Sequence, residues 1–83
     1  MTAATRQEVF ETVAALLATV CERHFEGVTP ATVLADLPGM DSLRLLETVA
    51  LAEEHFGVEI DTSRLETIET VDDIVTALVG GTA

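Results

Sequence analysis

Apolar residues that recur at helical spacing are the feature that most limits the folds open to this chain. In its N-terminal part they stand three or four positions apart, which gathers them on one side of a helix: Val9, Val13, Leu16, Leu17, Val20 and Phe25. Acidic Glu8 and Glu11 suit the positive N-terminal end of a helix, and Gly27 suits a C-terminal end. The pattern predicts a long helix from about Thr5 to Phe25.

A second helix is predicted from about Ser42 to Phe56, followed by Gly57, and it has two apolar stripes. One stripe consists of Leu45, Val49, Ala52 and Phe56, and the other of Leu43, Leu46 and Ala50. A surface helix of a small domain needs a single stripe, so either this helix is buried on most sides or the second stripe binds a partner. Flanking carboxylates favour the partner, because they are unfavourable in a core. The predicted partner-binding surface comprises Leu43, Leu46, Glu47, Ala50, Glu53 and Glu54.

The connection from Glu26 to Met40 is longer than most loops. Within it, Thr29-Pro30 suggests a short helical turn with the proline at its first position. Three apolar residues are expected to fasten the connection to the core: Val33, Leu34 and Leu37. A connection of this length leaves the flanking helices free to run in directions that a tight hairpin would forbid.

The C-terminal part predicts two further helices. A short one is expected from about Thr62 to Glu66, and a last one after Thr70, which resembles a capping box with Asp73. The inner face of the last helix is expected to comprise Val71, Ile74, Val75 and Leu78, with Gly80-Gly81 as its stop. Residues 58–60 could form a strand, but the chain offers no obvious second strand to pair with it. The sequence therefore predicts an all-α protein, a small irregular four-helix bundle of three longer helices and one short helix.

The charge of the chain limits its partners. It has 83 residues, few enough for one domain (1–83), with residues 1–4 expected to be disordered and residues 80–83 frayed. Fifteen Asp and Glu against four Arg and no Lys give a formal net charge of −11. This balance argues against nucleic acid and anionic membrane surfaces, which are bound through basic residues. It favours basic patches on partner proteins, and it also provides solubility.

The sequence also bears on location. No basic segment followed by an apolar run resembles a signal peptide, and no apolar run reaches the roughly 18 residues of a membrane span. Cys21 is the one cysteine, so there is no disulfide framework. This fits a reducing cytoplasm, where the protein is expected to be a monomer.

Catalysis and metal binding are not predicted. Ser42, His24 and His55 are residue types that a hydrolase uses, but the chain lacks a G-x-S-x-G motif and has little bulk for a catalytic pocket. The two histidines lie in separate predicted helices without metal-ligand spacing, and no calcium-loop pattern occurs. His24 is expected to be an exposed residue near a helix end.

Asp41 and Ser42 lie where the second long helix is expected to begin, just after a Pro38-Gly39 turn. The first N–H groups of a helix have no intrahelical partner, and the helix dipole is positive there. A phosphate attached to Ser42 would therefore be stabilised. Ser and Asp are also common N-caps, and that purely structural role accounts for the short motif equally well.

The tripeptide Asp41-Ser42-Leu43 resembles the Asp-Ser-Leu motif of the acyl carrier proteins. Further matches extend the resemblance over about half of the chain, from Leu37 to Leu78: Glu47, Glu53-Glu54 followed by Phe56, Glu59-Ile60, and Thr70-Val71 with Ile74. The N-terminal part matches only as a helix of the right length. Pro38 and Arg44 depart from the family's pattern, and Arg44 places a basic charge on an otherwise acidic face.

The resemblance implies a carrier without catalytic activity of its own. Ser42 would bear a 4′-phosphopantetheine arm, transferred from coenzyme A by a phosphopantetheinyl transferase, with Asp41 as its motif neighbour. The thiol of the arm would hold acyl intermediates as thioesters and deliver them to enzymes with basic docking patches. The pentapeptide 39–43 is similar to carriers of polyketide, antibiotic and related specialised metabolism, and fatty-acid synthesis is a further setting. Two alternatives remain: an aminoacyl or peptidyl carrier of a non-ribosomal peptide pathway, and an acidic helical adaptor without a prosthetic group.

Overall fold

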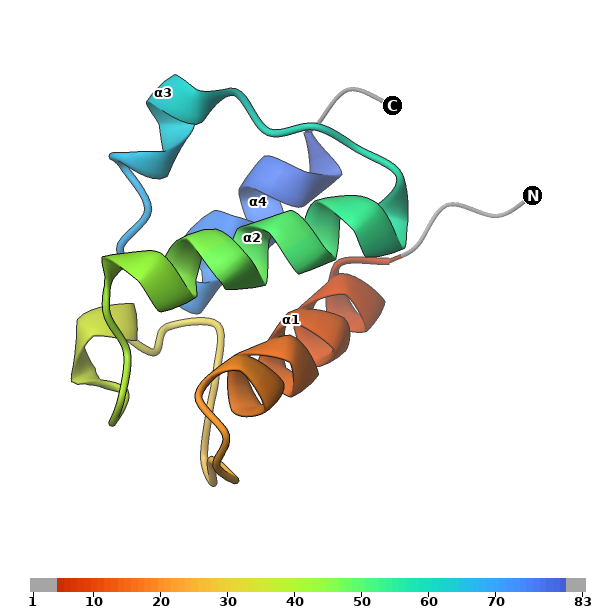
Figure 1. Ribbon diagram of the computed structural model, residues 1–83. Coiled ribbons are helices and arrows are strands. Elements are labelled where there is room, and N and C mark those ends of the chain that lie inside the picture. Colours follow the sequence, from red (N-terminus) through yellow and green to blue (C-terminus); the bar gives the residue numbers. More distant parts are fainter. Residues whose placement is uncertain (1–4, 81–83) are drawn as a thin grey trace.

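Helices form where apolar periodicity coincides with capping residues. The structure, a computed structural model, describes residues 5–80. Its elements in chain order are α1 (Arg6–Val20), the 3-10 helix η1 (Leu34–Asp36), α2 (Ser42–Phe56), α3 (Thr62–Leu65) and α4 (Val71–Val79) (Figure 1). Three longer helices and one short helix confirm the predicted all-α bundle. The segments 1–4 and 81–83, predicted to be disordered and frayed, lie outside the described residues, whereas Gly80 is described as the C-cap of α4.

The start of α1 follows from its capping residues. The Glu8 N–H donates to the Thr5 hydroxyl over 3.1 Å, and the Thr5 N–H donates back to the Glu8 carboxylate over 3.3 Å. This capping box satisfies two of the N–H groups that a helix start leaves open. The predicted apolar stripe faces the core, where α1 contributes Val9, Val13 and Leu17 as buried residues.

The end of α1 differs from the sequence-based expectation. The helix stops at Val20, so the predicted continuation to Phe25 and the stop at Gly27 are wrong. Glu22 causes the early stop, because its φ of 53° is left-handed. That turn lets the Arg23 N–H reach the Ala18 carbonyl over 3.1 Å and closes the helix. Phe25 lies beyond the helix but still packs against the core.

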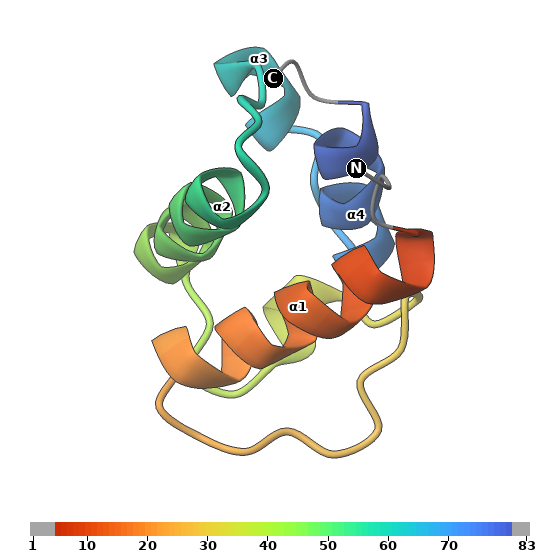
Figure 2. The same ribbon diagram turned by 90° about the vertical axis from the view of Figure 1, so that its right-hand side faces the viewer.

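The core lies where α1 crosses α2 and α4, both of which it contacts (Figure 2). Its buried apolar residues come from every longer helix and from the connections: Val9, Val13, Leu17, Leu34, Leu37, Val49, Ala52, Ile60, Val71, Ile74, Val75, Ala77 and Leu78. All four residues predicted for the inner face of α4 are among them. Burial of this apolar surface is the main stabilising contribution in a chain without disulfides.

The sides of α2 divide as its two stripes predict. The predicted bounds, Ser42 to Phe56 with Gly57 following, are confirmed, and Gly57 has the left-handed φ of 66° that ends the helix. The first stripe packs on the core, whereas the second faces away from it. The sequence did not single out Thr48, which is fully buried and donates its hydroxyl to the Arg44 carbonyl over 2.8 Å.

The long connection between α1 and α2 is fastened to the N-terminal end of α4. The Val71 N–H donates to the Thr32 carbonyl over 3.0 Å, and the Asp72 N–H donates to the Pro30 carbonyl over 2.9 Å. The Leu34 N–H donates to the Glu69 carbonyl over 2.8 Å. These bonds lead the chain across the bundle, so that η1 lies beside the start of α2.

Apolar contacts complete this attachment. Leu34 and Leu37 are buried as predicted, whereas Val33 is 41% exposed. Thr29 and Pro30 form a hydrogen-bonded turn that closes with the Thr32 N–H. The short helical element comes later, as η1.

The capping box of α4 is the predicted one. The Asp73 N–H donates to the Thr70 hydroxyl over 3.2 Å, and the Asp73 carboxylate accepts from the Thr70 and Glu69 N–H groups over 2.9 and 2.8 Å. These backbone N–H groups stabilise the ionised carboxylate and hold the pKa of Asp73 below its usual range. Asp73 therefore secures both the helix start and the segment before it.

The left-handed residue that ends α1 provides a test of the fold. Replacing Glu22 by Gly removes the cost of a left-handed non-glycine residue, about 1 kcal/mol. We expect the thermal midpoint to rise by roughly 4–8 °C per kcal/mol gained, as measured by circular dichroism. Glu26→Gly is the control, because Glu26 is exposed and outside the left-handed region; it should not raise the midpoint. An unchanged midpoint for Glu22→Gly would contradict this account of the helix end.

Candidate functional site

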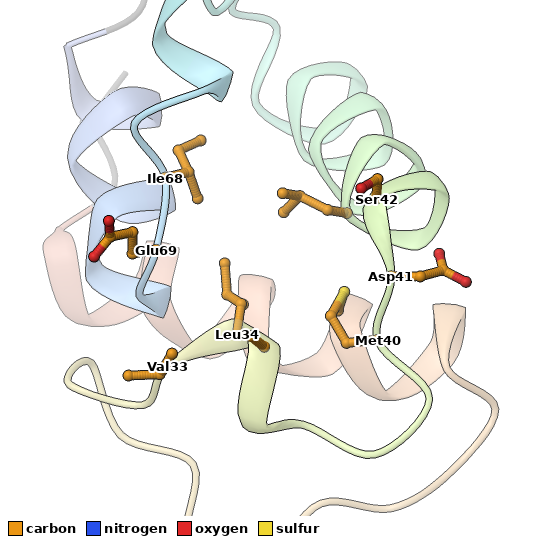
Figure 3. Close-up of a pocket in the computed structure, with 9 residues that line it drawn as sticks. Val33, Leu34, Met40, Asp41, Ser42, Ile68 and Glu69 are labelled. Carbon is orange, nitrogen blue, oxygen red and sulfur yellow. The ribbon is translucent and has the colours of Figure 1, made fainter.

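Ser42 is the first residue of α2, and the chain before it turns sharply. The Met40 N–H donates to the Leu37 carbonyl over 3.1 Å, and Gly39 has a left-handed φ of 83° that glycine adopts without strain. Asp41 is the N-cap in extended conformation, and Ser42 follows it as an exposed residue. The Ser42 hydroxyl points into a cavity, whereas the Asp41 carboxylate points away from that cavity (Figure 3).

The start of α2 leaves backbone donors next to this serine. The Arg44 N–H donates to the Asp41 carboxylate over 2.8 Å, and the Leu45 N–H donates to the Asp41 carbonyl over 3.0 Å. Within residues 5–80 the N–H groups of Ser42 and Leu43 have no acceptor. Open N–H groups at a helix start attract anions, so a phosphate ester at this hydroxyl is electrostatically supported.

An apolar cavity of about 460 Å³ opens beside Ser42. Three segments far apart in the sequence form its walls, namely η1 with the residue before it, the start of α2, and the connection from α3 to α4 (Figure 3). The lining residues are Val33, Leu34, Ala35, Met40, Asp41, Ser42, Leu45, Ile68 and Glu69. The mostly apolar lining can accept hydrocarbon, with the serine hydroxyl at its wall.

The second stripe of α2 is exposed and lies next to acidic residues. Leu43 is 66% exposed and Leu46 is 49% exposed, and Ala50 is exposed on the same side of the helix. Glu47 and Glu54 are also exposed. Leu51, 40% exposed, extends this apolar surface and was not predicted. Its position four residues after Glu47, on the same side of a helix, was the available sequence signal.

Glu53 differs from the other acidic residues predicted for this surface. It is half-buried, and its carboxylate accepts a hydrogen bond of 2.7 Å from the Ile60 N–H. The bond ties the segment after α2 back to the helix. Glu53 is therefore engaged within the fold, while its neighbour Glu54 is open to solvent.

The residues considered for other chemistry do not converge. His24 is exposed, and its Nε2 lies 4.0 Å from the Glu26 Oε1. The His55 ring packs edge-on against the Phe56 ring, with ring centroids 4.7 Å apart. Within residues 5–80, no three His, Cys, Asp or Glu side chains gather closely enough to hold a metal ion. The helices in this part of the chain are also too short or too polar to span a bilayer.

The fold and this site define a helical carrier module that presents a serine at a helix start. The chain matches the family of phosphopantetheine attachment sites over residues 11–78. It is 39% identical over 72 residues to an acyl carrier protein of Thermotoga maritima, covering 87% of this chain and 89% of that protein. It is 37% identical over 70 residues to one of Saccharopolyspora erythraea, covering 84% and 74%. A third, from Thermosynechococcus vestitus, is 34% identical over 70 residues, covering 84% and 86%.

The chain belongs to the acyl carrier protein family, whose members bear a phosphopantetheine attachment site. It is accordingly a non-catalytic carrier with a covalently attached 4′-phosphopantetheine group. As such it interacts with a phosphopantetheinyl transferase and with acyl-handling enzymes. The described residues fit the group, because an exposed hydroxyl, two open N–H groups and an apolar cavity meet at the start of α2. The adaptor without a prosthetic group is disfavoured.

The two adjacent glutamates near the end of α2 provide a test of the structural role of Glu53. Glu53→Ala leaves the Ile60 N–H without its charged acceptor, and we expect a loss of about 1–2 kcal/mol in the free energy of unfolding. Glu54→Ala makes the same change of charge at an exposed position and should alter stability little. Urea denaturation measures both. Equal losses would contradict the structural role of Glu53.

Proposed function

We propose that Ser42 is the attachment residue of the 4′-phosphopantetheine group. The observation that carries this proposal is an exposed hydroxyl at the first position of α2, beside two N–H groups without an acceptor. A transferase can reach this hydroxyl without unfolding the helix. The phosphate that joins the group to the serine would then be stabilised by the open N–H groups and the helix dipole. Asp41, as N-cap, keeps the helix start in place.

The cargo that we propose is an acyl group. The bound arm supplies a thiol that holds the acyl group as a thioester, and the protein supplies the surface that presents it. The curated relatives are named acyl carrier proteins, and the cavity beside Ser42 has an apolar lining that suits hydrocarbon. Met40, which favours acyl over aminoacyl cargo in the motif, packs against the core and lines this cavity. An aminoacyl or peptidyl carrier remains the second candidate.

The setting that we propose is polyketide, antibiotic or related specialised metabolism, with fatty-acid synthesis as the alternative. The support is the pentapeptide 39–43 together with the basic Arg44 on an otherwise acidic helix. We further propose that residues 1–83 act as one carrier domain and as a monomer in the cytoplasm. The shared apolar core and the free thiol of Cys21 support these proposals.

We also propose that the exposed side of α2 is the docking face, defined here as Leu43, Leu46, Glu47, Ala50, Leu51 and Glu54. The leucines would enter an apolar groove of a partner enzyme, and the two glutamates would pair with basic residues at the rim of that groove. Apolar anchors govern the lifetime of such a complex, and rim charges govern its rate of formation. A carrier has to leave each enzyme again, which fits a small interface. Glu53, predicted for this surface, would contribute through the Ile60 bond that shapes the end of α2.

The attachment residue is tested by intact mass. After incubation with coenzyme A and a broad-specificity phosphopantetheinyl transferase, the unmodified protein should gain the mass of one phosphopantetheinyl group. Ser42→Ala should gain nothing, whereas Ser63→Ala, which removes an exposed serine of α3, should be modified like the wild type. A wild type that stays unmodified, or a modified Ser42→Ala, would overturn the proposal.

The docking face is tested by charge reversal. Glu47→Lys should slow modification by the transferase, and the rate should depend less on salt, because a favourable rim charge has been replaced by a repulsive one. Glu11→Lys changes the net charge equally at an exposed position of α1 and serves as the control. The rates are compared at low and at physiological ionic strength. If Glu47→Lys matches the control at low salt, α2 is not the docking face.

A further inference from the structure

The N-terminus of α2 departs from the pattern of the other two longer helices. In α1 and α4 the third helical residue is acidic, Glu8 and Asp73, and its carboxylate accepts from the N–H of the cap residue. In α2 the third residue is Arg44. A cation in the first turn opposes the helix dipole, so this position is locally unfavourable. The exception occurs in the helix that presents Ser42.

Arg44 occupies both oxygens of the Asp41 carboxylate. Its N–H donates to Oδ1 over 2.8 Å, and its guanidinium Nη1 donates to Oδ2 over 3.0 Å. The two side chains are 41% and 54% exposed. An ion pair this exposed contributes little to stability, so stability does not account for the arginine.

The position of Arg44 connects the pair to the docking face. Arg44 stands three residues before Glu47 and seven before Leu51, a spacing that places all three on neighbouring positions of the helix surface. Arg44 therefore lies at the edge of the docking face, and its guanidinium is 3.0 Å from the Asp41 carboxylate. That carboxylate points away from the cavity (Figure 3). A partner enzyme approaching Ser42 along α2 meets Asp41 already paired.

We propose that Arg44 is a selectivity-determining residue that keeps the Asp41 carboxylate, next to the docking face, from binding basic groups of a partner. Because Arg44 binds both oxygens of that carboxylate, Glu47 and Glu54 remain as the acidic groups available to a partner. The fitting partner is an enzyme with basic residues opposite these two glutamates and a neutral or acidic group opposite the Asp41–Arg44 pair. Enzymes that need Asp41 as an open carboxylate are disfavoured. This inference rests on the proposed function of Ser42 and α2.

The proposal is tested with a double-mutant cycle on phosphopantetheinyl transfer. The probe is a broad-specificity transferase with a basic docking surface, and kcat/KM is measured for Arg44→Gln, Asp41→Asn and the double variant. Arg44→Gln should raise kcat/KM by about twofold to fivefold at low salt, the range of one exposed charge pair. The change should appear mainly in KM, and high salt should remove it. In the Asp41→Asn background, Arg44→Gln should raise kcat/KM by at most half as much, because position 41 then has no carboxylate for the substitution to release.

Two controls separate this role from a structural one. Gln at position 44 can close a capping box, so the thermal midpoint should not fall. Arg44→Lys keeps the charge and should leave kcat/KM near the wild-type value. Arg6→Gln breaks another exposed Arg–Asp pair, with Asp72 at 2.7 Å and far from α2 in the chain, and should not change kcat/KM.

The outcomes are distinct. No rise for Arg44→Gln, or an equal rise with and without Asp41, overturns the inference while the proposed function stands. A wild type that gains no phosphopantetheinyl group overturns the proposed function and this inference with it.

Discussion

The attachment of the long connection to the start of α4 is the constraint on which the rest of the structure depends. Carbonyls of Pro30 and Thr32 accept from the first N–H groups of α4, and the Glu69 carbonyl accepts from Leu34. The helix start thereby gains partners that its own backbone cannot supply. In return, the connection is held against the bundle, and Leu34 and Leu37 are buried. This arrangement sets where the chain enters α2, and hence where Ser42 lies.

The cavity is a consequence of the same attachment. η1 forms one wall, the start of α2 a second, and the segment before α4 a third. None of these segments would enclose apolar space alone; backbone hydrogen bonds and the burial of Leu34 and Leu37 bring them together. A serine at the first position of a helix is common, but here the hydroxyl points into an apolar cavity (Figure 3). With Ser42 as the proposed attachment residue, this combination would give the carrier both an attachment point and a place for hydrocarbon.

α2 combines a core side with the side proposed as the docking face. Its core side is held by Val49, Ala52 and the buried Thr48, whose hydroxyl is satisfied by the carbonyl one turn earlier. With that side fixed, leucines on the opposite side remain exposed, and a contiguous apolar patch of this kind is typical of interaction sites. Local rules of helix capping hold in α1 and α4, and the exception in α2 stands next to the serine. Departures of this kind are expected at functional sites.

The sequence by itself determined the helical class, the bounds of α2, the capping box of α4, and which sides of α2 and α4 face the core. These features depend on residues close together in the chain, through periodicity, caps and glycine stops. Family membership was likewise readable from short motifs between Leu37 and Leu78.

The tertiary structure alone decided the features that depend on distant or unusual backbone contacts. Gly27 resembles a helix stop in sequence, but the left-handed Glu22 ends α1 earlier, a conformation that glutamate rarely adopts. Glu53 and Glu54 are equivalent in sequence, and only the return of the chain at Ile60 distinguishes them. The cavity is likewise invisible in the sequence, because its walls come from three distant segments that meet only when the long connection is bonded and packed against the bundle.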